Sequence, residues 1–301
     1  MKKKKAKLRG LALLSGGLDS ILAVKILQEQ GIEVTGLSFT SYFFDSELAQ
    51  KAAQILKIEL KVVDFSEEHL KIVKNPAYGH GKAINPCIDC HLLMIKQAGE
   101  IMKKEKFDFI ATGEVLGERP MSQNRKSLDL IEEKSGVKGY LLRPLSAKLL
   151  SPTILEEKGL IKRDLLLDIQ GRRREKQMTL AKKYGIKDYP TPAGGCLLTE
   201  VQFGERFKDM INQWTEAKGN DMQLLRLGRH FWEKDNLILV GRNKEENDKI
   251  KELTQKGDLL IEPKEFPGPS ILVRSKDMIS KESLIRVKEL MIKYSSKLKK
   301  K

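Results

Sequence analysis

The stretch SGGLDS at residues 15–20 decides the fold of this chain, because of what lies on either side of it. The apolar run Leu11–Leu14 precedes it, and an amphipathic segment over residues 21–30 follows it. This order predicts a strand, a tight glycine turn and the N-terminus of a helix. Glycines at such a turn let backbone N–H groups approach an anion. We therefore predict a phosphate-binding turn at the edge of a sheet.

The side chains of this turn suit a nucleotide polyphosphate. Hydroxyl groups add hydrogen-bond donors, and the Asp19 carboxylate is a suitable ligand for a magnesium ion beside the phosphates. The stretch contains neither a G-x-x-x-x-G-K-[ST] loop nor a G-x-G-x-x-G dinucleotide fingerprint. An ordinary glycine turn capped by Asp and Ser is the alternative. The residues that we expect to contact ATP here are Ser15, Gly16, Gly17, Asp19 and Ser20.

Strand-like and helix-like segments alternate through the first part of the chain. We expect strands at 34–39, 60–65, 107–112 and 140–145 and helices at 46–56 and 92–104. A helical stretch is expected to follow the strand at 140–145 and to end at residue 184. This alternation predicts an α/β domain with a parallel sheet and helices on both faces. Ligands of such sheets bind beyond the carboxyl ends of the strands. The phosphate turn and the residues from Gly113 onward should therefore share one edge.

The character of the sequence changes after about residue 207. A loop rich in proline and glycine at 189–196 ends the alternating region. Short strand-like segments at 223–231, 236–241, 257–261 and 270–274 then precede an amphipathic helix at 281–294. We expect two domains, 1–206 and 207–301, of which the second is a small α+β domain.

Composition limits the class of protein. The chain has 301 residues, of which 40% are hydrophobic and 32% charged, as in soluble globular proteins. No apolar run approaches the ~20 residues of a membrane span, and the run after the N-terminal lysines is too short for a secretory signal. We therefore expect a cytoplasmic protein without a membrane partner.

The net charge of +15 suggests a polyanionic partner such as RNA. Arg172, Arg173 and Arg174 are the best candidates for contacting it, because guanidinium groups pair with phosphates and stack on bases. The lysine clusters at the two ends are explained equally well as solvated tails.

The chain contains three cysteines, Cys87, Cys90 and Cys196. The first two form a C-x-x-C pair at the start of an expected helix, where thiolates are stabilised, and Cys196 follows a loop that lets it fold back. We favour a [4Fe-4S] cluster with three cysteine ligands and one open iron, because these are the only cysteines and are expected beside the phosphate turn. The alternatives are zinc with His91 or His80, a redox pair, or packed thiols.

Three motifs together resemble the tRNA thiolation enzymes of the PP-loop ATPase class, which split ATP into AMP and pyrophosphate. They are the phosphate turn, NPCIDC at 85–90 and TGEVLGERPMSQ at 112–123. The last is most similar to the TGE-x-x-G-Q-x-x-S-Q signature of the tRNA 4-thiouridine synthases, with Glu118 in place of Gln. The resemblance covers residues 8–200, including LRPL at 142–145. The N-terminal THUMP region of those synthases has no counterpart in it, and the cysteine pattern is similar to cluster-dependent thiolases.

The resemblance implies an adenine nucleotide α-hydrolase-like fold and an ATP-dependent sulfurtransferase. A uridine carbonyl oxygen is adenylated, and sulfur held on the open iron then displaces AMP from a base that has left its stack. Gly113, Glu114 and Gln123 would line the nucleotide or uridine side of the pocket, and Phe39 would contact adenine. The residues expected to act in catalysis are Asp19, Cys87, Cys90 and Cys196.

The segments 240–248 and 270–274 are similar to the NFACT-R RNA-binding domain. This resemblance implies that Arg242 and Asn243 contact RNA, whereas the alternative is a turn with Asn243 as a helix N-cap.

The expected function is 4-thiouridine formation in tRNA, at uridine 8, with sulfide or a persulfide donor such as a cysteine desulfurase. The alternatives are a 2-thiouridylase acting at the anticodon, whose Asn-Pro-Cys motif is also similar, and an RNA-binding protein with a vestigial ATPase.

Overall fold

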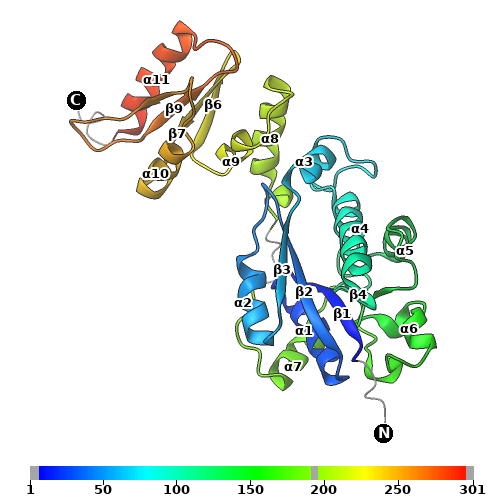
Figure 1. Ribbon diagram of the computed structural model, residues 1–301. Coiled ribbons are helices and arrows are strands. Elements are labelled where there is room, and N and C mark those ends of the chain that lie inside the picture. The colour runs from blue at the N-terminus through cyan, green and yellow to red at the C-terminus, as the bar shows by residue number, and fades with distance from the viewer. Residues whose placement is uncertain (1–6, 191–195, 296–301) are drawn as a thin grey trace. The chain divides into compact units, whose positions relative to one another are not determined.

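The computed structural model describes residues 7–190 and 196–295 and divides the chain into two compact units, Met1–Cys196 and Leu197–Lys301 (Figure 1). The expected boundary at 206/207 falls inside helix α8 (Val201–Gln213), which belongs to the second unit. In the described ranges, no helix combines the length and apolar character needed to cross a membrane.

A five-stranded sheet of order β3-β2-β1-β4-β5 forms the centre of the first unit, and all its neighbouring strands run parallel. Its strands are β1 (Arg9–Leu13), β2 (Glu33–Thr40), β3 (Leu60–Asp64), β4 (Phe109–Ala111) and β5 (Leu141–Leu142). The helices are α1 (Leu18–Glu29), α2 (Glu47–Leu56), α3 (Ser66–Lys74), α4 (Cys87–Glu105), α5 (Arg125–Lys134), α6 (Ile154–Glu157) and α7 (Glu175–Lys183).

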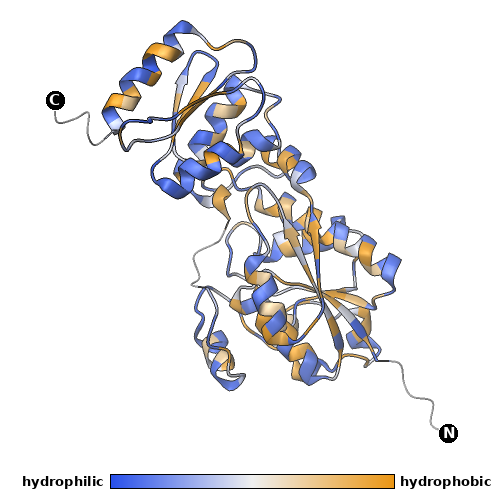
Figure 2. Cartoon of the chain, turned by 60° about the vertical axis from the view of Figure 1, so that its left-hand side comes forward, coloured by the Kyte–Doolittle hydropathy of each residue, from blue (hydrophilic) through white to orange (hydrophobic). Residues whose placement is uncertain are grey.

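Both faces of this sheet are covered by helices, because side chains alternate along each strand. On one face Ala12 of β1 joins a core with α1, α2, α6 and α7, and on the other face Leu11 joins a core with α4 and α5. Apolar residues accordingly concentrate on the strands of this sheet (Figure 2). The predicted α/β architecture with a parallel sheet is confirmed.

Two helices and one interruption differ from the sequence-based expectation. Helices α3 and α5 were not expected, and each buries only a few residues, such as Leu70 and Val73 in α3. Such a narrow apolar stripe gives a weak periodic signal. The expected helical stretch before residue 184 is broken into η1 (Ala147–Leu149), α6, η2 (Arg163–Leu165) and α7.

An aromatic cluster lies where β2 and β3 end. Phe39 contacts Phe65 with ring centroids 5.0 Å apart, and His69 stacks on Phe65 at 4.9 Å with an interplanar angle of 8°. His69 is fully buried, and neither ring nitrogen has a hydrogen-bond partner. Burial lowers the pKa of His69 to about 4, so the ring is neutral at physiological pH.

The second unit is a four-stranded antiparallel sheet of order β6-β7-β9-β8 with helices packed on it. Helix α11 covers one face, where Val287 and Leu290 meet apolar side chains of β7 and β9. The expected strand at 223–231 begins only at Arg229, because residues 220–224 form a short helix. The elements are η3 (Leu197–Thr199), α8, α9 (Asn220–Leu224), β6 (Arg229–Glu233), β7 (Asn236–Val240), α10 (Lys244–Glu252), β8 (Leu259–Ile261), β9 (Ile271–Arg274) and α11 (Lys281–Tyr294).

Candidate active site

The phosphate turn connects β1 to α1 and requires glycine at its tightest point. Gly16 has a φ of +80°, and a Cβ atom there would lie 2.4 Å from the backbone carbonyl group of Leu48. Gly17 is the N-cap of α1 and supplies no side-chain hydrogen bond to the first turn. The N-terminus of α1 therefore lacks the usual side-chain cap, which suits an anion.

The two serines of the turn have different surroundings. Ser20 is buried and donates a hydrogen bond of 2.8 Å from Oγ to the carbonyl oxygen of Gly17. Ser15 is exposed, and its Oγ accepts a hydrogen bond of 3.3 Å from the Gly17 N–H. Ser20 thus stabilises the turn, while the Ser15 hydroxyl has two long contacts within the described part of the chain, the one from Gly17 and a 3.4 Å contact to Ser20 Oγ.

Asp19 is a partly buried carboxylate with one weak contact. Its Oδ2 lies 3.5 Å from the Arg174 guanidinium, and its Oδ1 is buried without a hydrogen-bond partner. Burial raises the pKa of Asp19, although Arg174 opposes this rise. Burial and the nearby Asp19 charge also raise the pKa of Glu118. A buried carboxylate oxygen without a protein partner fits a magnesium ligand.

The loop after β4 packs directly on the phosphate turn. A Cβ atom at Gly113 would lie 2.5 Å from the Ser20 nitrogen, so only glycine permits this approach. Gln123, further along the same loop, is 9% exposed, and its Oε1 has no hydrogen-bond partner. The loop after β4 thus contains a buried polar atom that the protein leaves unsatisfied.

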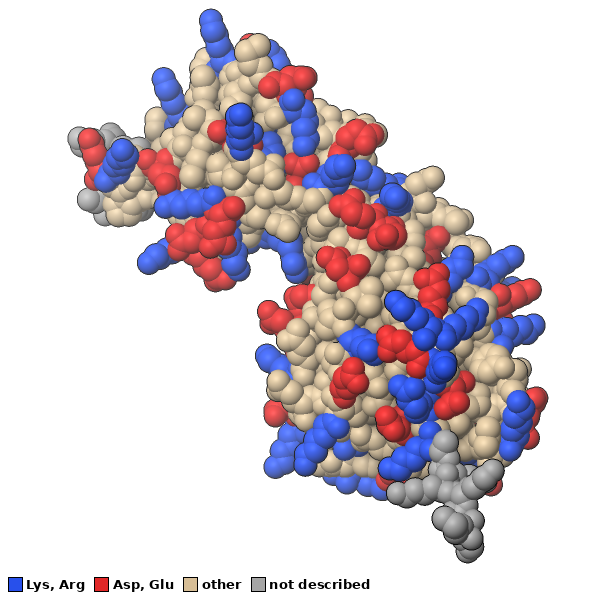
Figure 3. Space-filling view, in the orientation of Figure 1, with Lys and Arg blue, Asp and Glu red and all other residues tan. Residues whose placement is uncertain are grey.

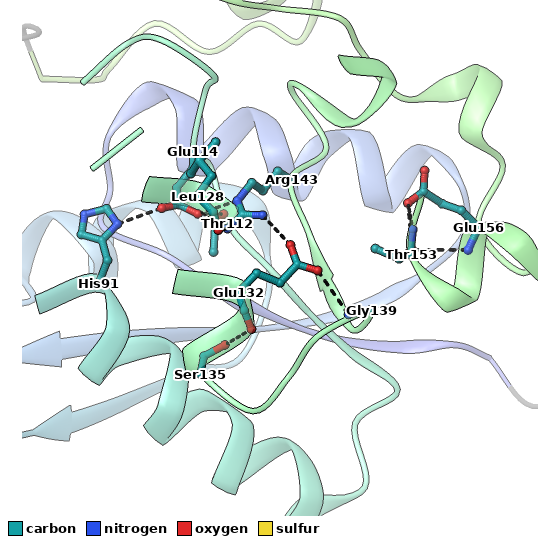
Figure 4. Close-up of polar contacts among 10 residues, drawn as sticks. All are labelled: His91, Thr112, Glu114, Leu128, Glu132, Ser135, Gly139, Arg143, Thr153 and Glu156. Carbon is teal, nitrogen blue, oxygen red and sulfur yellow. Dashed lines mark hydrogen bonds and ion pairs between the residues drawn. The ribbon is translucent and has the colours of Figure 1, made fainter. Parts of the chain in front are cut away.

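Glu114, by contrast, is held by several neighbours (Figure 4). Its Oε1 lies 2.8 Å from Nδ1 of His91, and its Oε2 accepts bonds of 2.9 Å from Thr112 and from Nε of Arg143. Arg143 also pairs with Glu132 at 3.0 Å. Burial alone would raise the pKa of Glu114, but Arg143 and His91 outweigh it and lower that pKa to about 2.

Two residues expected at the ligand are therefore placed inside the protein. Glu114 is 5% exposed and its oxygens are occupied by the network just described. Phe39 is 4% exposed and packs on Phe65 within the core. Glu114 thus belongs to a polar network and Phe39 to the apolar core, and their predicted contacts with nucleotide or uridine stay predictions.

The three cysteines lie close to one another in the first unit. Burial raises the pKa of the Cys90 thiol well above its usual value, and the nearby Cys196 and Cys87 raise it further. Asn85 donates a hydrogen bond of 3.1 Å to the Cys87 sulfur. Burial thus opposes the thiolate that the N-terminus of α4 is expected to favour at Cys90.

A continuous chain of contacts links these cysteines to the phosphate turn. Gly113 packs against Ser20, and the next residue, Glu114, binds His91, which directly follows Cys90. Because α4 runs antiparallel to the strands, its N-terminus lies at the same edge of the sheet as that of α1. The predicted nucleotide and sulfur sites are therefore neighbours.

The cysteine neighbourhood does not have the geometry of a metal site. Over residues 7–190 and 196–295, no group of three or more His, Cys, Asp or Glu side chains is arranged to hold an ion. The histidines proposed as zinc ligands have other partners, since His91 binds Glu114 and His80 lies 2.9 Å from the Val73 carbonyl oxygen. Neither the cluster nor the zinc alternative is supported by the described side chains.

The three consecutive arginines at 172–174 differ in exposure. Arg172 and Arg173 are exposed, whereas Arg174 turns toward Asp19. In the second unit Arg242 pairs with Glu246, and Asn243 accepts the Glu246 N–H at 2.9 Å as the N-cap of α10. On the face shown in Figure 3, basic and acidic side chains are interspersed. The predicted RNA contacts of Arg242 and Asn243 stay predictions, because their side chains have internal partners.

The fold and the turn define an α/β nucleotide-binding domain followed by a small α+β domain. The chain belongs to the tRNA methyl transferase HUP domain family, whose pattern matches residues 9–183. Residues 228–301 match the NFACT protein RNA binding domain.

Curated relatives include tRNA-specific 2-thiouridylases and a probable tRNA sulfurtransferase. The 2-thiouridylase of Helicobacter acinonychis is 30% identical over 51% of this chain and 47% of its own length, and that of Natranaerobius thermophilus is 25% identical over 74% and 64%. The probable tRNA sulfurtransferase of Finegoldia magna is 32% identical over 46% and 36%. The chain thus spans less than two thirds of the length of each.

Two solved structures show a limited likeness. A predicted tRNA methyltransferase subunit from Methanocaldococcus jannaschii has a TM-score of 0.39 at 15% identity, covering 58% of this chain and 76% of that one. A 4-thiouridine synthetase in complex with RNA and ATP has a TM-score of 0.36 at 16% identity, covering 59% and 51%. Likeness of this size supports no inference about function.

Proposed function

We propose that this protein is an ATP-dependent sulfurtransferase that converts a uridine of tRNA to 2-thiouridine. The observation that carries the proposal is the chain of contacts from the phosphate turn through Gly113, Glu114 and His91 to Cys90. It supports the proposal because it puts the phosphate turn near a group of three cysteines, as thiolation of an activated carbonyl requires. The family match and the relatives named 2-thiouridylases support the same activity.

In this proposal the phosphate turn binds the polyphosphate of ATP. The uncapped N-terminus of α1 and the Ser15 hydroxyl donate to phosphate oxygens, and Asp19 holds magnesium. The uridine carbonyl oxygen attacks the α-phosphate and pyrophosphate leaves. The base-linked AMP is then a good leaving group when sulfur attacks the same carbon.

The 2-position replaces the 4-position as the preferred target. The relatives named 2-thiouridylases favour it over the 4-thiouridine product expected from the motif at 112–123. The 4-position is the second candidate, supported by that motif.

An activity assay tests both candidate products, 2-thiouridine and 4-thiouridine. Purified protein is incubated with unmodified tRNA, ATP, magnesium and sulfide. Chromatographic separation of the digested nucleosides should show 2-thiouridine. A 4-thiouridine product would support the second candidate, and AMP formation without any thionucleoside would overturn the proposal.

The mechanism proposed above does not depend on the predicted [4Fe-4S] cluster. No step is assigned to iron, because the described cysteines are not arranged as ligands. Iron analysis of anaerobically purified protein tests the prediction directly, with Cys87→Ala, Cys90→Ala and Cys196→Ala as variants. A cluster requires iron that each variant loses. Thiolation by iron-free protein would instead indicate that sulfide or a persulfide donor acts without a cluster.

We further propose that tRNA binds to the second unit and to the exposed pair Arg172 and Arg173. The match of residues 228–301 to an RNA-binding domain supports this proposal. Removal of residues 197–301, which follows the observed division of the chain, should strongly weaken tRNA binding. Equal affinity of the shortened and full chains would contradict it.

A further inference from the structure

Arg174 has contacts that its two exposed neighbours lack. It directly precedes α7, it lies 3.5 Å from Asp19 across 155 residues of sequence, and its side chain is only 12% exposed. Its Nε is buried without a hydrogen-bond partner. A buried guanidinium with one long contact and an unused donor is poorly satisfied by the protein alone.

The loop that carries Arg174 is fixed beside the phosphate turn. Leu116 and Gln170 form a parallel bridge, and Gly171 donates a hydrogen bond of 2.7 Å to the Leu116 carbonyl oxygen. Leu116 belongs to the same loop as Gly113, which packs on Ser20. The backbone just before Arg174 is therefore tied to the loop after β4, and the Arg174 side chain is largely buried.

A second unsatisfied group lies next to it. Gln177, in the first turn of α7, is fully buried, and neither of its amide atoms has a hydrogen-bond partner. Its amide is close enough to Asp19 to lower the pKa of that carboxyl. Unpaired buried donors and acceptors cost stability, so several of them around one carboxylate indicate a place where a polar ligand supplies the missing bonds.

We propose that Arg174 is a binding residue for the β- and γ-phosphates of ATP, and thus for the pyrophosphate product, at the phosphate turn. The guanidinium fork would pair with phosphate oxygens, and the neighbouring Asp19 carboxylate would hold the magnesium ion. The unpaired Gln177 amide near Asp19 offers a further polar group to the same ligand. The inference deepens the proposed function and rests on it, and it takes Arg174 away from the predicted RNA surface.

Equilibrium binding of ATP and of pyrophosphate, each without tRNA, tests this inference. Arg174→Ala should lower the affinity for both at least 10-fold, and Arg174→Lys should recover part of the loss. Adenosine, which has no phosphates, should bind the variant and the wild type equally. Lys182→Ala is the matched control, because it removes an exposed cation from the same helix.

Circular dichroism checks whether Arg174→Ala folds. If it does not fold, Arg174→Gln is used in its place. Wild-type affinity of a folded Arg174 variant for pyrophosphate would overturn the inference while leaving the proposed function intact. Failure of the wild-type protein to bind ATP would overturn both. ATP binding with no thionucleoside in the product assay would overturn the proposed function alone.

Discussion

Two carboxylates of the first unit, Asp19 and Glu114, are both shielded from water, yet their surroundings are opposite. Glu114 is bound by His91, Thr112 and Arg143, whereas Asp19 has one long contact to Arg174 and a free buried oxygen. Burial raises the pKa of Asp19, while Arg143 and His91 overcome burial and lower the pKa of Glu114 to about 2. A satisfied carboxylate supports the fold, and an unsatisfied one is available to a ligand.

The largest expected effect on stability follows from the satisfied carboxylate. Glu114→Gln leaves the buried Arg143 guanidinium without its main counter-charge, and breaking a buried pair costs about 3–5 kcal/mol of unfolding free energy. Denaturant unfolding followed by circular dichroism measures the loss. Fluorescence serves as an internal reference, because both tryptophans, Trp214 and Trp232, lie in the second unit. A loss of unfolding free energy below about 1 kcal/mol would contradict the role of Glu114 in supporting the fold.

The matched change at the unsatisfied carboxylate should affect activity and not stability. Asp19→Asn keeps the shape of the side chain but removes a magnesium ligand, so ATP-to-AMP turnover should fall at least about 100-fold, or about 2.7 kcal/mol. The unfolding free energy should stay within about 1 kcal/mol of wild type, because little binds this carboxylate in the protein. Undiminished AMP production would remove Asp19 from the proposed mechanism.

A third buried group, His69, makes the stability of the protein depend on pH. Its pKa of about 4 in the folded state lies below the unfolded value of 6.5, so the unfolded chain takes up a proton first. Stability should therefore fall as pH falls below 6.5, by about 2 kcal/mol at pH 5. Glu114 acts in a separate window, from pH 4.5 down to 2, where its protonation removes stability.

Denaturant unfolding at pH 7 and pH 5 tests this expectation with two variants. His69→Phe retains an aromatic ring among Phe44 and Phe65 and should lose most of the pH dependence. His80→Asn changes an exposed histidine and should retain it. Equal pH dependence of wild type and His69→Phe would show that other groups cause the acid loss.

The smallest expected effect concerns the exposed arginines. Replacing both Arg172 and Arg173 with alanine should weaken tRNA binding and reduce the magnitude of its salt-dependence slope by up to about 2, as expected for two phosphate contacts. Nucleotide affinity should not change, in contrast to Arg174→Ala. Titrations of tRNA at several salt concentrations measure the slope, and an unchanged slope would exclude these two residues from the tRNA surface.

The sequence predicted the parts of the first unit whose signals are local. The strand, glycine turn and helix around residues 15–20 follow from adjacent residues, and the alternation of segments gave the parallel sheet. Helix α3 was missed because four of its nine residues are charged and few are buried. The strand expected at 223–231 was placed early because the apolar residues Leu224 and Leu225 serve the core from α9 and its end.

Site residues that depend on distant contacts could not be predicted in this way. The roles of Arg174 and Gln177 require the bridge between Leu116 and Gln170, which no local pattern indicates. In the sequence, Glu118 stands out only as a departure from a motif, and its closeness to Asp19 depends on how the loop after β4 packs. Glu114 carried a functional expectation from its motif, yet its partners His91 and Arg143 come from other elements.

The span between Asp19 and Arg174 also has a consequence for synthesis on the ribosome. The two residues are 155 positions apart, so at roughly 5–20 residues per second the arginine is added about 8–30 seconds after the aspartate. During that interval β1 and β2 can already pair and α1 can pack on them. The contact between Arg174 and the phosphate turn cannot yet exist. Nascent chains stalled before residue 174 should therefore bind ATP weakly even when their sheet has formed, and the appearance of ATP affinity would time the completion of the unit.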